Sequence, residues 1–159
     1  MTETTATAAV LTPRGRGAVA SIRLRGDNAV LDWQLFHAAN AKPLAEQEVG
    51  RILFGRWGIE PTEEVVVCRR DLETVEIHCH GGDAAVRRIL ADLESAGCRV
   101  VPWIEQHAAE YGLLEAECHE ALSRATTLRT AAILLDQASG TLRQAFAALL
   151  ASPPLRKGG

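Results

Sequence analysis

The stretch Val75–Gly82 reads Val-Glu-Ile-His-Cys-His-Gly-Gly and indicates the architecture of this chain more clearly than any other. Apolar and ionisable residues alternate along it, and a period of two is typical of a half-buried β-strand. The pattern predicts a strand with two different faces. One face packs against a core and carries Val75, Ile77 and Cys79. The other is available for chemistry and carries Glu76, His78 and His80.

The residues after the glycine pair predict a helix and then a further strand. Asp83 is a suitable N-cap, and Gly97 is a suitable stop at the C-terminal end. Between them the apolar side chains recur at helical spacing, at Val86, Ile89, Leu90 and Leu93. Strand character returns over Cys98–Trp103, so the sequence predicts a strand-helix-strand unit whose two strands can be parallel neighbours.

The residues before Val75 predict more strands and one more helix. Residues 50–57, 64–69 and 74–80 are short β-like runs that fit an antiparallel meander, and residues 6–11 and 18–24 predict a strand, a turn and a strand. Asp27 is a plausible N-cap for a helix that extends to Ala39. Strands and helices in this order predict an α+β domain over residues 1–104, built on a mixed sheet with packed helices.

The last third of the chain is expected to be helical. From Gln106 onward the residues are mainly Ala, Leu, Glu, Arg and Thr, which favour helices. Two apolar faces recur there, one at Leu128, Ala132 and Leu135, the other at Leu142, Phe146, Leu149 and Leu150. We expect a helical segment over residues 105–151 whose apolar faces need a covering surface, and a linker or chain end over residues 152–159.

Composition narrows the class of protein. A formal charge of -3 and a pI near 6.0 argue against nonspecific nucleic-acid binding, which depends on neutralising phosphates with Lys and Arg. The four cysteines show no Cys-x-x-Cys spacing, which favours a reduced, cytoplasmic protein. No apolar run approaches the ~18 residues that a membrane span requires. We therefore expect neither secretion nor membrane insertion.

The exposed face of Val75–Gly82 allows a metal site. His78 and His80 with Glu76 as a third ligand could converge on one ion. Histidines two residues apart are common by chance, so we favour hydrogen-bonded structural or pocket histidines and expect no metal. Gly81, Gly82 and Asp83 could present amides to an anion, but a tight strand-to-helix turn is the preferred interpretation because the N-cap is acidic.

The Val75–Gly82 motif and the helix after it closely resemble the amino-terminal domain of the TrmE (MnmE) family of tRNA-modification GTPases. That family carries a near-identical Val-Glu-Ile-His-Cys-His-Gly-Gly segment, and its opening strand, Pro-Gly-Arg-Gly turn and second strand are similar to residues 5–26 of this chain. Glu120–Leu122 and the alanines after it look more loosely like the start of the family's central helical domain. The resemblance implies an aminomethyltransferase-like, folate-binding fold followed by C-terminal helices.

In that family the domain dimerises and holds a one-carbon tetrahydrofolate derivative, in a 5-formyl or methylene form, near the subunit interface. The folate supports modification of the wobble uridine of certain tRNAs, together with a flavoprotein partner and GTP hydrolysis. Arg23 and Glu76 match motif positions associated with the folate pocket, and Arg14 and Arg16 match the turn beside it. The resemblance thus implies a cofactor-binding set of Arg23, Glu76, His78, His80, Arg14 and Arg16, with no catalytic residue in this chain.

Several alternatives stay open. The family's Pro-Gly-Glu-Phe-Thr motif is replaced by Pro102, Trp103 and the residues after them, and Leu113 stands where the family has a functional lysine. A structural dimerisation module that has lost folate binding is therefore the main rival. The chain has no Gly-x-x-x-x-Gly-Lys-Ser/Thr phosphate loop, so no GTP site is expected in it. Glu76 could equally well form a salt bridge to Arg23, and Arg14 and Arg16 could be a solvated turn.

Overall fold

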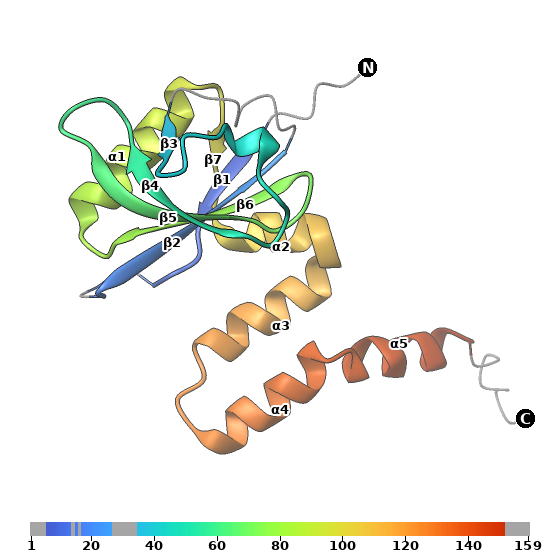
Figure 1. The fold of residues 1–159 in the computed structure, drawn as a ribbon. Coiled ribbons are helices and arrows are strands. Elements are labelled where there is room, and N and C mark those ends of the chain that lie inside the picture. The colour runs from blue at the N-terminus through green and yellow to red at the C-terminus, as the bar shows by residue number, and fades with distance from the viewer. Residues whose placement is uncertain (1–5, 14, 16, 27–34, 152–159) are drawn as a thin grey trace, which may run out of the picture. The chain divides into compact units, whose positions relative to one another are not determined.

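The computed structural model describes residues 6–13, 15, 17–26 and 35–151, in two compact units, Met1–Trp103 and Ile104–Gly159. The first unit combines a sheet with helix α1, and the second unit is helical (Figure 1). The α+β class with a mixed sheet, predicted from the strand and helix patterns, is confirmed.

The first unit is built on a seven-stranded sheet with the order β3-β4-β5-β6-β2-β1-β7. Its elements are β1 (Thr7–Val10), β2 (Val19–Arg25), β3 (Phe36–Ala38), the short 3₁₀ helix η2 (Leu44–Glu46), β4 (Ile52–Trp57), β5 (Glu63–Arg69), β6 (Thr74–His80), α1 (Asp83–Ser95) and β7 (Arg99–Val100). Neighbouring strands are antiparallel except for β7, which pairs parallel with β1.

The predicted meander of β4, β5 and β6 is confirmed. Val66 lies opposite Phe54 on β4 and opposite His78 on β6, so these three side chains share one face of the sheet. Along β6 the burial alternates as the sequence predicts, with Val75, Ile77 and Cys79 buried on the opposite face. The period of two therefore identifies both faces correctly.

Helix α1 begins at Asp83 and ends in a Schellman motif. The Gly97 N–H donates to the carbonyl of Glu94 at 3.0 Å, and the Cys98 N–H donates to that of Leu93 at 2.9 Å, while Gly97 takes a φ of 93°. The N-cap residue is Gly82, so the expectation of Asp83 as N-cap is wrong by one position. Asp83 instead lies in the first turn, where the helix dipole also favours a carboxylate.

Three other expectations are corrected. Residues 36–38 of the helix predicted over Asp27–Ala39 form strand β3, because Phe36 and Ala38 pair with Trp57 and Gly55 of β4; residues 27–34 lie outside the described part. The strand predicted over Cys98–Trp103 shortens to β7, and Trp103 already begins a helix. In addition, β6 and β7 run parallel but are separated by β2 and β1.

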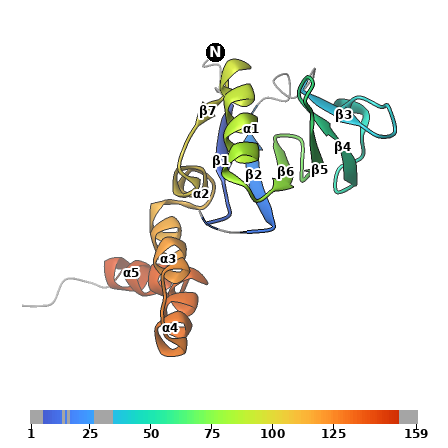
Figure 2. The same ribbon diagram turned by 90° about the vertical axis from the view of Figure 1, so that its left-hand side faces the viewer.

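The core of the first unit lies between α1 and one face of the sheet (Figure 2). Ile89 and Leu93 of α1 are fully buried against strand residues such as Ile22 and Ile77. Burial of each such side chain contributes about 2 kcal/mol to folding. The indole N–H of Trp57 donates to Asp92 Oδ2 at 3.0 Å, which ties β4 to α1. We call the opposite face, which carries Glu76 and His78, the open face.

The second unit contains α2 (Trp103–Tyr111, starting at the last residue of the first unit), α3 (Leu113–Ser123), α4 (Leu128–Ala138) and α5 (Thr141–Ala151). The predicted helical character is confirmed, and the Thr127 hydroxyl caps α4 by accepting from the Thr130 N–H. Large apolar side chains of both predicted faces are exposed, including Leu128, Leu135, Phe146, Leu149 and Leu150. No helix in the described part of the chain is both long and apolar enough to cross a membrane.

Candidate functional site

The centre of the open face is an ion pair between neighbouring strands. Arg23 of β2 lies directly opposite Glu76 of β6, and its Nη2 donates to Glu76 Oε1 at 3.2 Å. The side chains are only 25% and 17% exposed, so the pair is less screened than a surface salt bridge. The second carboxylate oxygen, Oε2, lies 4.0 Å from His78 Nε2, which is beyond hydrogen-bond length. Among the described residues, no group donates a hydrogen bond to Glu76 Oε2.

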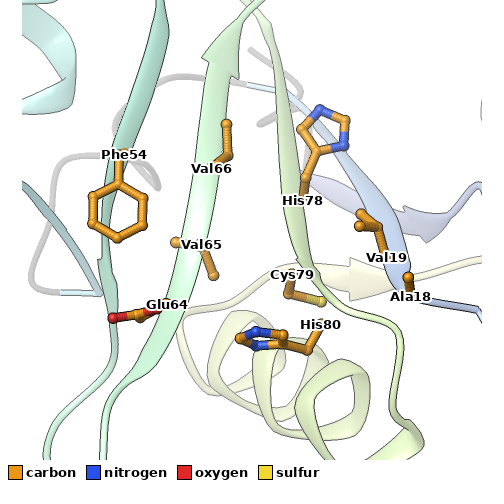
Figure 3. A pocket seen from close by; sticks show the side chains of 9 residues that line it. All are labelled: Ala18, Val19, Phe54, Glu64, Val65, Val66, His78, Cys79 and His80. Carbon is orange, nitrogen blue, oxygen red and sulfur yellow. The ribbon is translucent and has the colours of Figure 1, made fainter.

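His78 occupies the next position along the same face. Its Nδ1 lies 2.8 Å from the Ser21 hydroxyl on β2, which faces it across the strand pair. That hydrogen bond orients the imidazole ring beside Glu76. A shallow pocket of about 230 Å³ lies next to it, and Figure 3 shows Phe54, Val66 and His78 on three neighbouring strands that line it.

His80 is at the end of β6 and has a different partner. Its Nδ1 lies 2.5 Å from Glu63 Oε1 on β5, and the ring is 68% exposed. The structure thus places His80 in the lining of the pocket, paired with Glu63 and four positions along β6 from Glu76. Within the described ranges, no three His, Cys, Asp or Glu side chains are grouped closely enough to hold a metal ion. The trio Glu76, His78 and His80 gives no support to a metal-dependent enzyme.

Cys79 faces the core, on the opposite side of β6 from its two histidine neighbours. Burial, with a smaller contribution from the charge of Glu63, raises the pKa of the Cys79 thiol above its usual value. Burial alone raises the pKa of Cys98 to about 11. Because the thiolate is the nucleophile, the raised pKa values disfavour nucleophilic chemistry at both cysteines near neutral pH. All four cysteines are free and buried.

The predicted site residues are only partly brought together. Arg23, Glu76 and His78 adjoin one another, His80 pairs with Glu63, and Arg14 and Arg16 lie outside the described residues. Ser21 and Glu63 were not predicted from the sequence. Ser21 could have been found, because it lies two residues before Arg23 on a strand and must share its face. Nothing in the sequence indicates the contact of Glu63.

The glycine pair serves as a tight turn. The Gly81 N–H donates to the Ala18 carbonyl at 3.0 Å, and a Cβ at Gly81 would come 2.0 Å from the carbonyl oxygen of Gly17. Only a residue without a side chain allows the two backbones to approach so closely. The preferred interpretation of the pair, as a strand-to-helix turn, agrees with this packing.

The fold and the open face define an α+β domain with an ion pair between two central strands of its sheet. The family profile described as GTP-binding protein TrmE N-terminus matches residues 6–102. The chain belongs to this family, as the resemblance predicted.

Full-length relatives give the same result. The chain is 35% identical to the tRNA modification GTPase MnmE of Geobacillus kaustophilus, 34% identical to that of Geobacillus thermodenitrificans and 30% identical to that of Symbiobacterium thermophilum. The matches cover 89%, 89% and 87% of this chain and 34% of each relative. The chain thus spans about a third of the length of these relatives.

Proposed function

We propose that this chain is a TrmE-type amino-terminal domain that dimerises and binds a one-carbon tetrahydrofolate derivative, in support of tRNA wobble-uridine modification by a longer GTPase. The observation that carries the proposal is the Glu76 carboxylate, held by Arg23 on the open face with one oxygen left over. In the family resemblance, these two residues fall at positions associated with the folate pocket. The domain itself catalyses no reaction in this proposal. The longer protein binds tRNA and a flavoprotein partner in the cytoplasm.

The chemistry of Glu76 suits a pterin ring. A carboxylate accepts two N–H groups from the donor edge of such a ring, here one at Oε2 and one at Oε1, whose second lone pair accepts from Arg23. Charge-assisted hydrogen bonds of this kind are short and strong. Arg23 holds the carboxylate in position, and the Ser21–His78 hydrogen bond fixes the neighbouring ring. Binding would replace solvent at Glu76 Oε2 and leave the Arg23 contact in place.

The open face needs a second surface to enclose such a ligand. Its pocket of about 230 Å³ is smaller than the roughly 300–1,000 Å³ of ordinary ligand sites. Large apolar side chains beside it stay exposed, with Phe54 at 54%, Val19 at 56% and Ile52 at 74%. Exposed apolar residues that gather on one face are typical of an interaction surface. A second copy of the chain on this face would cover them and deepen the pocket.

Titration calorimetry with 5-formyltetrahydrofolate tests the ligand. We expect the wild-type chain to bind, and Glu76→Gln to weaken binding at least about tenfold, because the amide removes a charge-assisted acceptor. Glu64→Gln is the matched control, since Glu64 is an exposed carboxylate that lines the adjacent pocket but does not pair with Arg23. No heat at millimolar ligand, or an equal loss in both variants, would contradict the folate proposal.

Light scattering after size exclusion tests the dimer separately. We expect twice the 17.1 kDa chain mass for the wild type, and a monomer for Phe54→Glu, because a charge would be buried at the contact. Ile59→Glu is the control: Ile59 is 82% exposed but lies in the loop between β4 and β5. A dimer without folate binding would favour the rival structural module, which Leu113, in place of the family's functional lysine, supports. A wild-type monomer would rule out both.

A further inference from the structure

We propose a second ligand site, a groove between α1 and the β1–β7 edge of the sheet that binds a compact apolar or aromatic molecule carrying one anionic group. We call it the α1 groove. Its volume is about 620 Å³, within the range of small-molecule sites. All of its lining residues belong to the first unit: Val10, Thr12, Pro13, Asp83, Val86, Arg87, Leu90, Val100, Val101, Pro102 and Trp103.

The walls of the α1 groove are apolar. Val86 and Leu90 lie one turn apart on α1, and Val10 and Val100 come from the two strands at the edge of the sheet. These four side chains pack against the core but are only partly buried, so each keeps apolar surface in contact with solvent. Trp103 adds an indole ring to the lining. A concave surface of this kind gains free energy when an apolar ligand displaces its water.

The charged residues of the groove indicate an anion. Arg87 and Asp83 are one helical turn apart, and neither side chain has a hydrogen-bond or ion-pair partner among the described residues. Asp83 lies in the first turn of α1, where the helix dipole offsets its charge. The long Arg87 side chain is exposed and can move over the groove. Arg87 is therefore the cation that a ligand's carboxylate or sulfonate would pair with.

A third polar group is at the β1 end. The Thr12 hydroxyl oxygen accepts the Ser21 N–H at 3.2 Å, which leaves the hydroxyl hydrogen available to donate. A few polar groups on an apolar concave surface are the usual composition of a ligand site. The α1 groove lies on the side of the sheet that carries α1, while Glu76 faces the opposite side, so the two sites are independent.

Two fluorescent probes of nearly the same shape test the α1 groove. Anilinonaphthalene sulfonate is anionic, and N-phenylnaphthylamine lacks the sulfonate. We expect the anionic probe to bind one-to-one. Arg87→Gln should weaken its binding about fivefold and Asp83→Asn should strengthen it by a similar factor, as for single exposed charges. Neither substitution should change the affinity of the neutral probe. Both residues are exposed, so these variants should fold normally.

Leu90→Gln tests the apolar wall and should weaken both probes, whereas Phe54→Ser on the open face should weaken neither. The proposal is overturned if Arg87→Gln leaves the anionic probe unaffected, if several probe molecules bind per chain, or if Phe54→Ser abolishes binding. These outcomes do not bear on folate, because Glu76→Gln is expected to leave both probes bound as in the wild type.

Discussion

Gly81→Ala is expected to lower the free energy of unfolding by about 3 kcal/mol, the upper end of the usual cost of overpacking. The added Cβ would stand 2.0 Å from the Gly17 carbonyl oxygen and 3.0 Å from the Val19 N. Both are backbone atoms, so no side chain can rotate away to relieve the overlap. Urea unfolding followed by circular dichroism measures the loss.

Gly82→Ala is the matched control in the same motif. A Cβ at Gly82 meets nothing within 4 Å, and its φ of -77° is open to any residue. The change should stay within about 1 kcal/mol of the wild type, because reduced freedom of the unfolded chain offsets a weaker N-cap. Equal losses in the two variants would show that the turn, and not the contact with Gly17, requires glycine.

The sequence predicted the elements whose residues have a clear period. Val75–His80 alternates strictly, and Val86, Ile89, Leu90 and Leu93 recur at helical spacing, so the faces of β6 and α1 are correct. The predicted N-cap was displaced by one residue: Gly82 has the extended backbone of an N-cap, and Asp83 already lies in the first turn of the helix. Local patterns of this kind depend on only a few neighbouring residues.

The errors fall where partners are distant in the sequence. Phe36 and Ala38 form a strand because they pair with Trp57 and Gly55, and a Cβ at Gly55 would clash with the Phe36 ring. The apolar spacing of residues 27–39 cannot reveal that pairing. Likewise, β7 joins β1 and not β6, since the first hairpin lies between them. Long-range pairing overrides local propensity at these positions.

The sequence predicted which face of β6 carries the site residues, but it did not predict the contacts that their side chains make. The period of two places Glu76 and His78 together, whereas the bond from Arg23 to Glu76 depends on a register between residues 53 positions apart. The Glu63–His80 contact similarly joins two strands across the β5–β6 turn. Neither register can be read from charge or spacing alone.

The second large effect on the free energy of unfolding is expected from replacing Arg69, a buried arginine on β5. Arg69 is 8% exposed, and its Nη1 donates to the carbonyls of Ala45 and Gln47 at 2.8 Å each and of Leu44 at 3.3 Å. These carbonyls lie in and just after η2, so one cation satisfies the end of that helix and joins it to the sheet. The guanidinium geometry suits several acceptors at once.

Arg69→Met should therefore lower the free energy of unfolding by about 3 kcal/mol, because methionine keeps the apolar stem but leaves carbonyl oxygens without donors. Arg69→Lys should lose less, since an ammonium retains three donors. Arg70→Met, at the exposed neighbouring position, should stay within about 0.5 kcal/mol of the wild type. Urea unfolding of the three variants decides the point: if Arg70→Met costs as much as Arg69→Met, the loss comes from net charge and not from the carbonyl contacts.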